Sequence, residues 1–321
     1  MLSRSDKLLF KNVQKGKLGV NNIVKLHCEE PMTILCYAIS LQNFEWVSYL
    51  VDNGADVNLG VSGTTPLTEA VMCTSYSTFR QIVSKLMEPR AGHPALNFSC
   101  TSHGRSLIQE LITFQQDEDY LWFLLDNNFN INTQSKDIID ANGGLCRITD
   151  YTPFVYCIQM RNFTLAKQLR ARGACANIAA TQIAYHRKYR VHALEIACFH
   201  SRCPANERLR DVRQVLELKA NVDTRDQRGM TCLHVAAERE MPRLCKLLIE
   251  YGANVNIRSE IAYKYQTPIE FAEIPQVQEE IWKSVCKRRI AFCMIVHPRV
   301  GSCFGRYLSS DILWKIVSIY L

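Results

Sequence analysis

Apolar residues recur along this chain with the spacing of short amphipathic helices that come in pairs. The clearest stretch is "GMTCLHVAAEREMPRLCKLLIEYGANVNIRS", residues 229–259. Its pattern predicts a turn, a first helix over 232–240, a second helix that begins at Pro242, and an extended finger after Gly252. Proline suits the first turn of a helix, and glycine readily takes the left-handed conformation that ends one.

The same pattern returns in weaker form from near the start of the chain to residue 287. Its first helices are expected to open at Thr33, Thr65, Ser106, Thr152, His192, Thr231 and Thr267. These openings lie 32 to 46 residues apart, and most extra residues follow the extended finger, as in "TQSKDIIDANGGLCRIT" and "IAATQIAYHRKYR". Insertions there lengthen loops without disturbing the stacking of neighbouring helix pairs, so the sequence predicts a repeat array.

Residues 229–259 resemble the ankyrin repeat. The matching positions are Thr231, Leu233, His234, Ala236, Ala237, Leu247, Leu248, Gly252, Ala253, Val255 and Asn256, while Cys232 stands where the family usually has proline. The resemblance implies an all-α solenoid of about seven helix pairs over residues 32–287, with long finger loops and a capping repeat over 1–31. It also implies that His234 hydrogen-bonds nearby backbone, and that the fingers and the concave face bind a client protein.

Composition and charge narrow the class of protein. The chain is 47% apolar and 21% charged, and its start is studded with charged residues, unlike a signal peptide. The longest apolar run, 290–296, is too short for a membrane span, which needs about 20 residues. We therefore expect a soluble cytoplasmic or nuclear protein with no membrane partner.

Cysteine and histidine residues are the candidate sources of chemistry in this chain. Six of the fourteen cysteines fall inside apolar periods and are expected to be reduced core thiols: Cys36, Cys73, Cys157, Cys198, Cys232 and Cys245. Two clusters, Cys198–His200–Cys203 and Cys286–Cys293–His297–Cys303, lack the paired spacing of zinc sites. No catalytic motif is present, so we expect no enzyme, no metal and no cofactor.

Two finger segments carry the residue types that anchor protein interfaces, because tyrosine and arginine add contact area and directional hydrogen bonds. The candidate client-binding residues are Tyr185, Arg187, Lys188, Tyr189 and Arg190 in the first segment, and Tyr263 and Tyr265 in the second. A flexible polar insertion is the alternative interpretation. Stacking on single-stranded nucleic acid is disfavoured, because the first 280 residues carry a net charge of only +1.

The C-terminal segment 288–321 is basic and ends in an amphipathic pattern. Its apolar positions are Leu308, Ile312, Leu313, Ile316, Val317, Tyr320 and Leu321. The pattern resembles the first helix of an F-box, with Ser309 in place of the family's proline, and a shortened F-box after ankyrin repeats is the PRANC arrangement of poxvirus ankyrin proteins. "SVCKRRI", residues 284–290, is similar to the start of a SOCS box.

Either box implies docking to a cullin-type ubiquitin ligase through a Skp1-like or elongin-like adaptor. A repeat array also needs a capping element at its end, and an amphipathic helix suits that purpose. The chain is thus expected to be a ubiquitin ligase adaptor that recruits a client. A non-degradative scaffold or inhibitor with a structural cap is the alternative.

Overall fold

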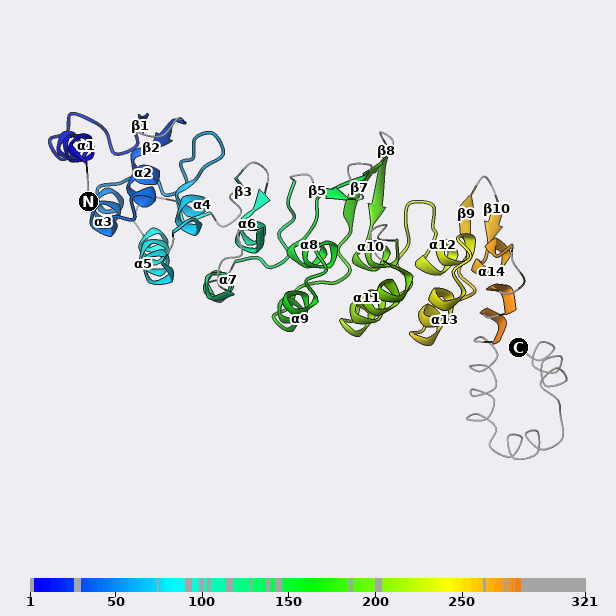
Figure 1. Ribbon diagram of the computed structural model, residues 1–321. Helices are drawn as coiled ribbons and strands as arrows, with labels where there is room; N and C mark the ends of the chain where they lie inside the picture. Colours follow the sequence, from blue (N-terminus) through cyan, green and yellow to red (C-terminus); the bar gives the residue numbers. More distant parts are fainter. Residues whose placement is uncertain are drawn as a thin grey trace, which may run out of the picture. The chain divides into compact units, whose positions relative to one another are not determined.

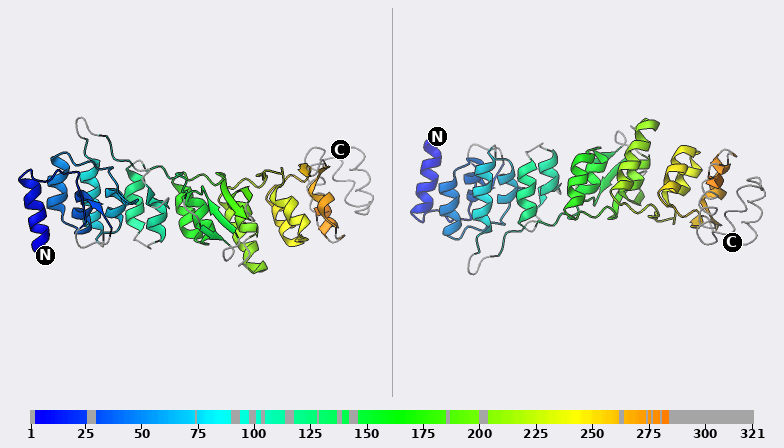
Figure 2. Two further views of the ribbon diagram at one scale, coloured as in Figure 1. Left: turned by 90° about the horizontal axis from the view of Figure 1, so that it is seen from above. Right: turned by 90° about the horizontal axis from the view of Figure 1, so that it is seen from below.

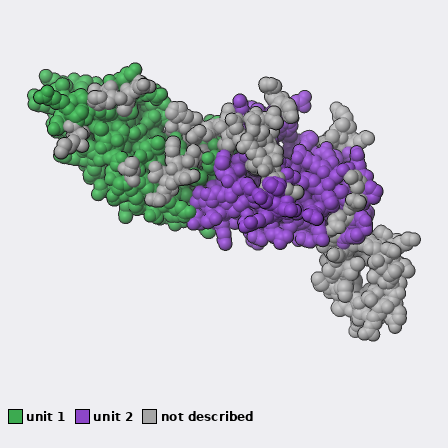
Figure 3. Space-filling view, in the orientation of Figure 1, with its two compact units in different colours: residues 1–139, 148–156, 171–174 green, residues 140–147, 157–170, 175–321 purple. Residues whose placement is uncertain are grey.

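The computed structural model describes residues 3–25, 30–73, 75–89, 94–97, 101–102, 105–113, 118–127, 129–136, 139–141, 146–184, 187–199, 204–261, 264–273, 275, 277–279 and 281–283. Contacts between residues divide the chain into two compact units (Figure 3). Unit 1 comprises residues 1–139, 148–156 and 171–174. Unit 2 comprises residues 140–147, 157–170 and 175–321.

Unit 1 is built from paired helices with short strands beside them (Figure 1). Its helices are α1 (Arg4–Gln14), α2 (Ile34–Ser40), α3 (Phe44–Asp52), α4 (Pro66–Val71), α5 (Tyr76–Met87), α6 (Leu107–Thr113) and α7 (Glu118–Asp126). Its strands are β1 (Ile23–Val24), β2 (Met32–Thr33), β3 (Thr101–Ser102) and β4 (Arg105–Ser106). The first helices of the pairs, α2, α4 and α6, contact one another in a row, and α3, α5 and α7 form the second row (Figure 1).

Unit 2 repeats this two-row arrangement (Figure 1), and Figure 2 shows its helices from above and from below. Its helices are α10 (Ala193–Phe199), α11 (Ala205–Glu217), α12 (Cys232–Glu238), α13 (Pro242–Glu250) and α14 (Pro268–Phe271). The division between the units passes through α8 (Pro153–Gln159) and the end of α9 (Phe163–Ala171).

Strands β5 (Ile139–Ala141), β6 (Cys146–Thr149), β7 (Ala180–Ala184) and β8 (Arg187–Val191) form one sheet in the order β5-β6-β7-β8. Strands β9 (Ser259–Ile261) and β10 (Lys264–Gln266) form a separate antiparallel hairpin. The β7–β8 and β9–β10 hairpins both rise on the side of the first helices, away from α11 and α13 (Figure 1).

The predicted openings are confirmed, because a helix begins at the residue directly after each of them. Threonine explains much of this regularity. Thr33 Oγ1 accepts the backbone N–H of Cys36 at 3.2 Å, and Thr152 Oγ1 accepts that of Val155 at 3.3 Å. Such N-caps satisfy a donor that the first turn of a helix leaves unpaired.

The helix boundaries predicted for residues 229–259 are also confirmed to within two residues. The first helix, α12, ends at Glu238 rather than at residue 240, and α13 begins at Pro242 as expected. Gly252 has φ +100°, the left-handed conformation that only glycine adopts without strain. The chain therefore leaves α13 directly into the extended finger.

The core lies between the two rows of helices. The first helices are buried almost throughout, and α12 buries Cys232, Leu233, Ala236 and Ala237. The second helices bury one face only, as in α5 with Phe79, Ile82, Val83 and Leu86. Helices of seven residues are too short to be stable alone, so their stability comes from this packing.

Consecutive fingers are joined by asparagine and aspartate side chains that accept backbone N–H groups. In unit 1, Asn21 Oδ1 accepts from Asp56 at 2.8 Å. In unit 2, Asn177 Oδ1 accepts from Asn221 at 2.8 Å, and Asp223 Oδ1 accepts from Asn254 at 2.9 Å. Each bond crosses from one finger to the next, which fixes the spacing of the fingers above the helices.

The expectation of an all-α fold with finger loops was incomplete. The insertion 178–190 contains β7 and all of β8 except Val191, and the finger after α13 contains β9 and β10. Within each segment the two strands pair with each other, so the backbone N–H and C=O groups that face the neighbouring strand find partners without help from the helices. The extra residues between helix pairs thus form ordered hairpins.

We expect Leu248→Ala in α13 to lower the free energy of unfolding by about 2–5 kcal/mol, because Leu248 is fully buried and its removal leaves a cavity. Urea unfolding followed by circular dichroism measures the change. Glu250→Ala, at an exposed position of the same helix, is the control. Equal losses from the two substitutions would contradict the core described here.

Candidate functional site

The hairpin of β7 and β8 is the most distinct surface feature that the sequence singled out. Its strands are antiparallel over five residue pairs, from Ala180 opposite Val191 to Ala184 opposite Arg187. Val191 and Ala180 are buried at the base, whereas Arg187, Lys188 and Arg190 are exposed. The base of the hairpin is therefore anchored in unit 2, and the upper part of β8 is open to solvent.

Alternation along β8 divides its side chains between two faces. Tyr189, half-buried, shares the face of buried Val191 and lies opposite Gln182. Lys188 and Arg190 share the other face, opposite Ile183 and Thr181. Both faces of the strand thus carry a positive charge, because Arg187 lies on the face of Tyr189.

The charge of the hairpin belongs to a longer acid-free segment. No aspartate or glutamate occurs between Asp150 and Glu195, although this stretch holds seven cations: Arg161, Lys167, Arg170, Arg172, Arg187, Lys188 and Arg190. The net charge of +1 over the first 280 residues conceals this segment. A local count of charge would have found it.

The fold engages three of the seven cations. Arg161 pairs with Asp211 at 2.7 Å and Glu207 at 2.8 Å, both on α11. Arg170 donates to the Leu218 carbonyl at 2.9 Å.

Arg172 forms an ion pair with Asp126 and lies over the Trp122 ring, with its Cζ 4.6 Å from the ring centroid. These contacts neutralise or anchor Arg161, Arg170 and Arg172, whereas Lys167 is exposed on α9.

Arg187, Lys188 and Arg190, here called the hairpin cations, have no ion pair or side-chain hydrogen bond within the part of the chain that the structure describes. No carboxylate stands on β7 opposite them. Their charges are therefore available to a ligand.

The other residues predicted to bind a client or a ligase do not lie on β8. Tyr265 lies in β10, where it is paired with Glu260. Tyr185 and Tyr263 lie outside the described residues, as do all seven apolar positions of the C-terminal segment. The structure thus brings together Arg187, Lys188, Tyr189 and Arg190 on one strand.

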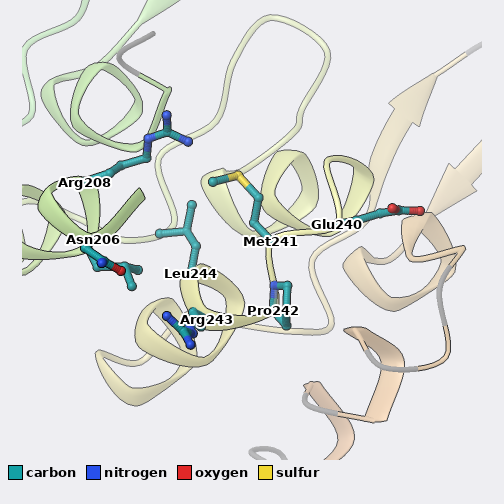
Figure 4. Close-up of a pocket in the computed structure, with 8 residues that line it drawn as sticks. Asn206, Arg208, Glu240, Met241, Pro242, Arg243 and Leu244 are labelled. Carbon is teal, nitrogen blue, oxygen red and sulfur yellow. The ribbon is translucent and has the colours of Figure 1, made fainter. Parts of the chain in front are cut away.

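A cavity of about 340 Å³ in unit 2 escaped the sequence analysis (Figure 4). It lies between the first turns of α11 and the turn from α12 into α13. Its lining residues are Asn206, Arg208, Leu209, Glu240, Met241, Pro242, Arg243 and Leu244. Its charged lining residues are one glutamate, Glu240, and two arginines, Arg208 and Arg243, and Glu240 points away from both arginines (Figure 4). This lining offers no nucleophile and no paired acid and base.

His234 has the structural position that the resemblance implied. The Thr231 backbone N–H donates to His234 Nδ1 at 3.1 Å, and Thr231 Oγ1 lies 2.9 Å from the same nitrogen. Because Nδ1 accepts, the neutral ring carries its proton on Nε2. The ring is fully buried and meets Phe271 edge-on at 5.6 Å, which leaves no access for a substrate.

The six cysteines assigned to the core are all buried free thiols, which confirms their placement. Burial raises the pKa of Cys36 to about 11 and that of Cys157 to about 12, so these thiols are protonated and unreactive at neutral pH. Among the described residues, no three potential metal ligands gather at one point. No helix in that part of the chain is both long and apolar enough to cross a bilayer.

Two stretches of the chain match known family models. Residues 7–93 match ankyrin repeats (3 copies), and residues 228–260 match the ankyrin repeat. The first stretch contains α2 to α5, and the second contains α12 and α13. The chain therefore contains ankyrin repeats, which are typically non-enzymatic modules for protein–protein interaction, and no catalytic family is indicated.

Other comparisons are more distant. The solved ankyrin repeat domain of Bcl-3, described as a unique member of the IkappaB protein family, aligns with 16% identity and a TM-score of 0.38. That alignment covers 86% of this chain and 91% of the Bcl-3 chain. No curated protein matches the sequence.

The position of His234 predicts a pH dependence of stability. Burial lowers its pKa below the ordinary 6.5, and the backbone carbonyls of Gln266 and Ile257 oppose this shift only in part. The unfolded chain therefore binds a proton at a higher pH than the folded chain does. Stability from the neutral ring is complete above about pH 6.5 and is lost as the pH falls from there toward the lowered pKa of the folded state.

We expect His234→Gln to remove this dependence, because glutamine does not titrate and its carbonyl can still accept the Thr231 N–H. The wild-type free energy of unfolding should fall relative to the variant by at most about 1.4 kcal/mol per pH unit. Urea titrations between about pH 7.5 and 5 measure the difference. A constant difference across that range would contradict the assignment.

Proposed function

We propose that this chain is a protein-interaction scaffold that captures a client protein on the β7–β8 hairpin. In this proposal residues 1–31 cap the array at its N-terminus and residues 32–287 form about seven ankyrin repeats. The observation that carries the proposal is the set of three hairpin cations without partners among the described residues. The ankyrin repeats found in both units support it.

The chemistry of the hairpin fits capture of an acidic surface. Arginine makes bidentate hydrogen bonds to carboxylates, and a cluster of unpaired cations speeds the encounter with an acidic partner. Tyr189 adds an aromatic ring beside them, anchored by its half-buried position. Tyr185, Tyr263 and Tyr265 are proposed as further contacts: Tyr185 follows β7 and Tyr263 follows β9 in the sequence, and Tyr265 belongs to β10.

The proposed role of the C-terminal segment rests on its sequence. We infer that Leu308, Ile312, Leu313, Ile316, Val317, Tyr320 and Leu321 dock a Skp1-like or elongin-like adaptor and so bring the client to a cullin-type ubiquitin ligase. The buried free thiols support a reducing compartment, the cytoplasm or the nucleus. The alternative is a non-degradative scaffold or inhibitor in which this segment only caps the array.

We expect the double substitution Lys188→Glu/Arg190→Glu to weaken client binding at least about tenfold, because it replaces attraction by repulsion at the proposed contact. The client is identified by affinity purification and mass spectrometry, and its affinity is then measured with purified proteins. Lys167→Glu/Arg213→Glu makes the same change in net charge at exposed positions on α9 and α11 and serves as the control. Equal affinity of both variants would exclude the hairpin.

Truncation after Arg306 separates the two roles of the C-terminal segment. We expect the full chain to co-purify with cullin components and the truncated chain to retain the client but lose the cullin, because only the docking residues are removed. Quantitative mass spectrometry of both purifications measures this. Cullin retained equally by both chains would refute docking, and a truncated chain that no longer folds would indicate a cap.

A further inference from the structure

Strand β8 occupies the edge of its sheet. In the order β5-β6-β7-β8 it has one neighbour, β7, and within the described residues no other strand pairs with it. In an antiparallel ladder every second residue turns its N–H and C=O away from the neighbouring strand. Among the described residues, none of these outward groups on 187–191 has a backbone partner.

An edge of this kind accepts an added strand. The backbone groups along β8 offer a ladder of donors and acceptors over five residues, the length of an ordinary strand. The buried base at Val191 holds the strand in place, so an arriving segment meets a backbone that is already ordered.

The side chains of β8 define what kind of segment fits. Lys188 and Arg190 are two residues apart on one face, so their Cα atoms lie about 6.8 Å from each other. Glutamates at every second position of a paired strand have the same spacing and would stand across from them. Arg187 lies on the opposite face of β8, and its charge would repel cationic side chains of the added strand on that face as well.

We infer that β8 binds an extended acidic segment of the client as an additional strand of the sheet β5-β6-β7-β8. This inference rests on the proposed function and specifies how the client is recognised. Backbone hydrogen bonds to β8 supply the docking geometry. The hairpin cations select carboxylates, and the like charges of a basic segment would be repelled.

The test uses the full chain and two synthetic peptides of equal charge: acetyl-(Thr-Glu)4-amide, the threonine peptide, and the same sequence with an N-methyl group on every glutamate, the methylated peptide. In an antiparallel pairing, a glutamate across from Lys188 or Arg190 donates its own backbone N–H to β8, and N-methylation removes this donor while the carboxylates are unchanged. We expect the threonine peptide to bind about tenfold tighter than the methylated peptide, since only the former completes the ladder. Fluorescence anisotropy of labelled peptides measures both affinities.

Amide hydrogen exchange, followed by NMR, locates the bound peptide. The threonine peptide should slow the hydrogen exchange of those backbone N–H groups in 187–191 that point away from β7. These N–H groups would donate to carbonyls of the added strand or be covered by it. Lys188→Glu/Arg190→Glu should abolish this protection, whereas Lys167→Glu/Arg213→Glu should preserve it. Unchanged cross-strand signals between Ala180 and Val191 verify that the hairpin remains folded in each variant.

Three outcomes would overturn the inference. Equal binding of the two peptides would mean that charge alone is read. Binding of neither peptide would mean that the cations only protect the edge from unwanted pairing, and tighter binding of a thymidine oligonucleotide would point to nucleic acid. The peptide results test how β8 recognises a ligand, and the client measurement tests the proposed function separately. The proposed function fails only if the client still binds the Lys188→Glu/Arg190→Glu variant.

Discussion

The structure depends on one constraint: none of its short first helices is stable without its neighbours. Helix α12 has seven residues and is buried at Cys232, Leu233, Ala236 and Ala237, far too much apolar surface for a helix of that length to carry alone. It persists because α10, α13 and α14 contact it. Since most of this burial comes from neighbouring helices, the fingers beyond their buried bases are free to vary in length and conformation, and they do so at β7–β8 and β9–β10.

Neighbouring fingers are linked to one another by polar contacts, namely hydrogen bonds between side chains and backbone. Asn177, Asp223 and their counterparts in unit 1 link one finger to the next through side-chain oxygens and backbone N–H groups. These bonds are exposed and individually weak, about 1 kcal/mol or less each. Their effect is positional: they hold the bases of the fingers in register, so that a hairpin growing from one finger projects from a fixed platform.

The sequence predicted the helices well because their signals are local. A threonine followed by an apolar period marks five of the seven predicted first helices, and Pro242 and Gly252 bound α13. Strand pairing is not local: Thr181, Ile183, Tyr189 and Val191 suit strands individually, yet nothing in their order says that they pair. The candidate site was found by residue type, but its charge was underestimated, because acids elsewhere in the first 280 residues cancelled the cations of 151–194 in the sum.

How the fold treats those cations is the strongest reason to regard the hairpin as a binding surface. Arg161 and Arg172, which lie beside helices, receive partners from elsewhere in the sequence, Asp211 and Asp126, whereas Lys167 is exposed on α9 with no ion pair among the described residues. Beside Arg187, Lys188 and Arg190 the fold supplies none among the described residues, and it concentrates their mutual repulsion on one five-residue strand. Repulsion between clustered like charges lowers the stability of the free protein, and binding of an opposite charge relieves that repulsion. The hairpin is thus a surface whose electrostatics are completed by an acidic partner.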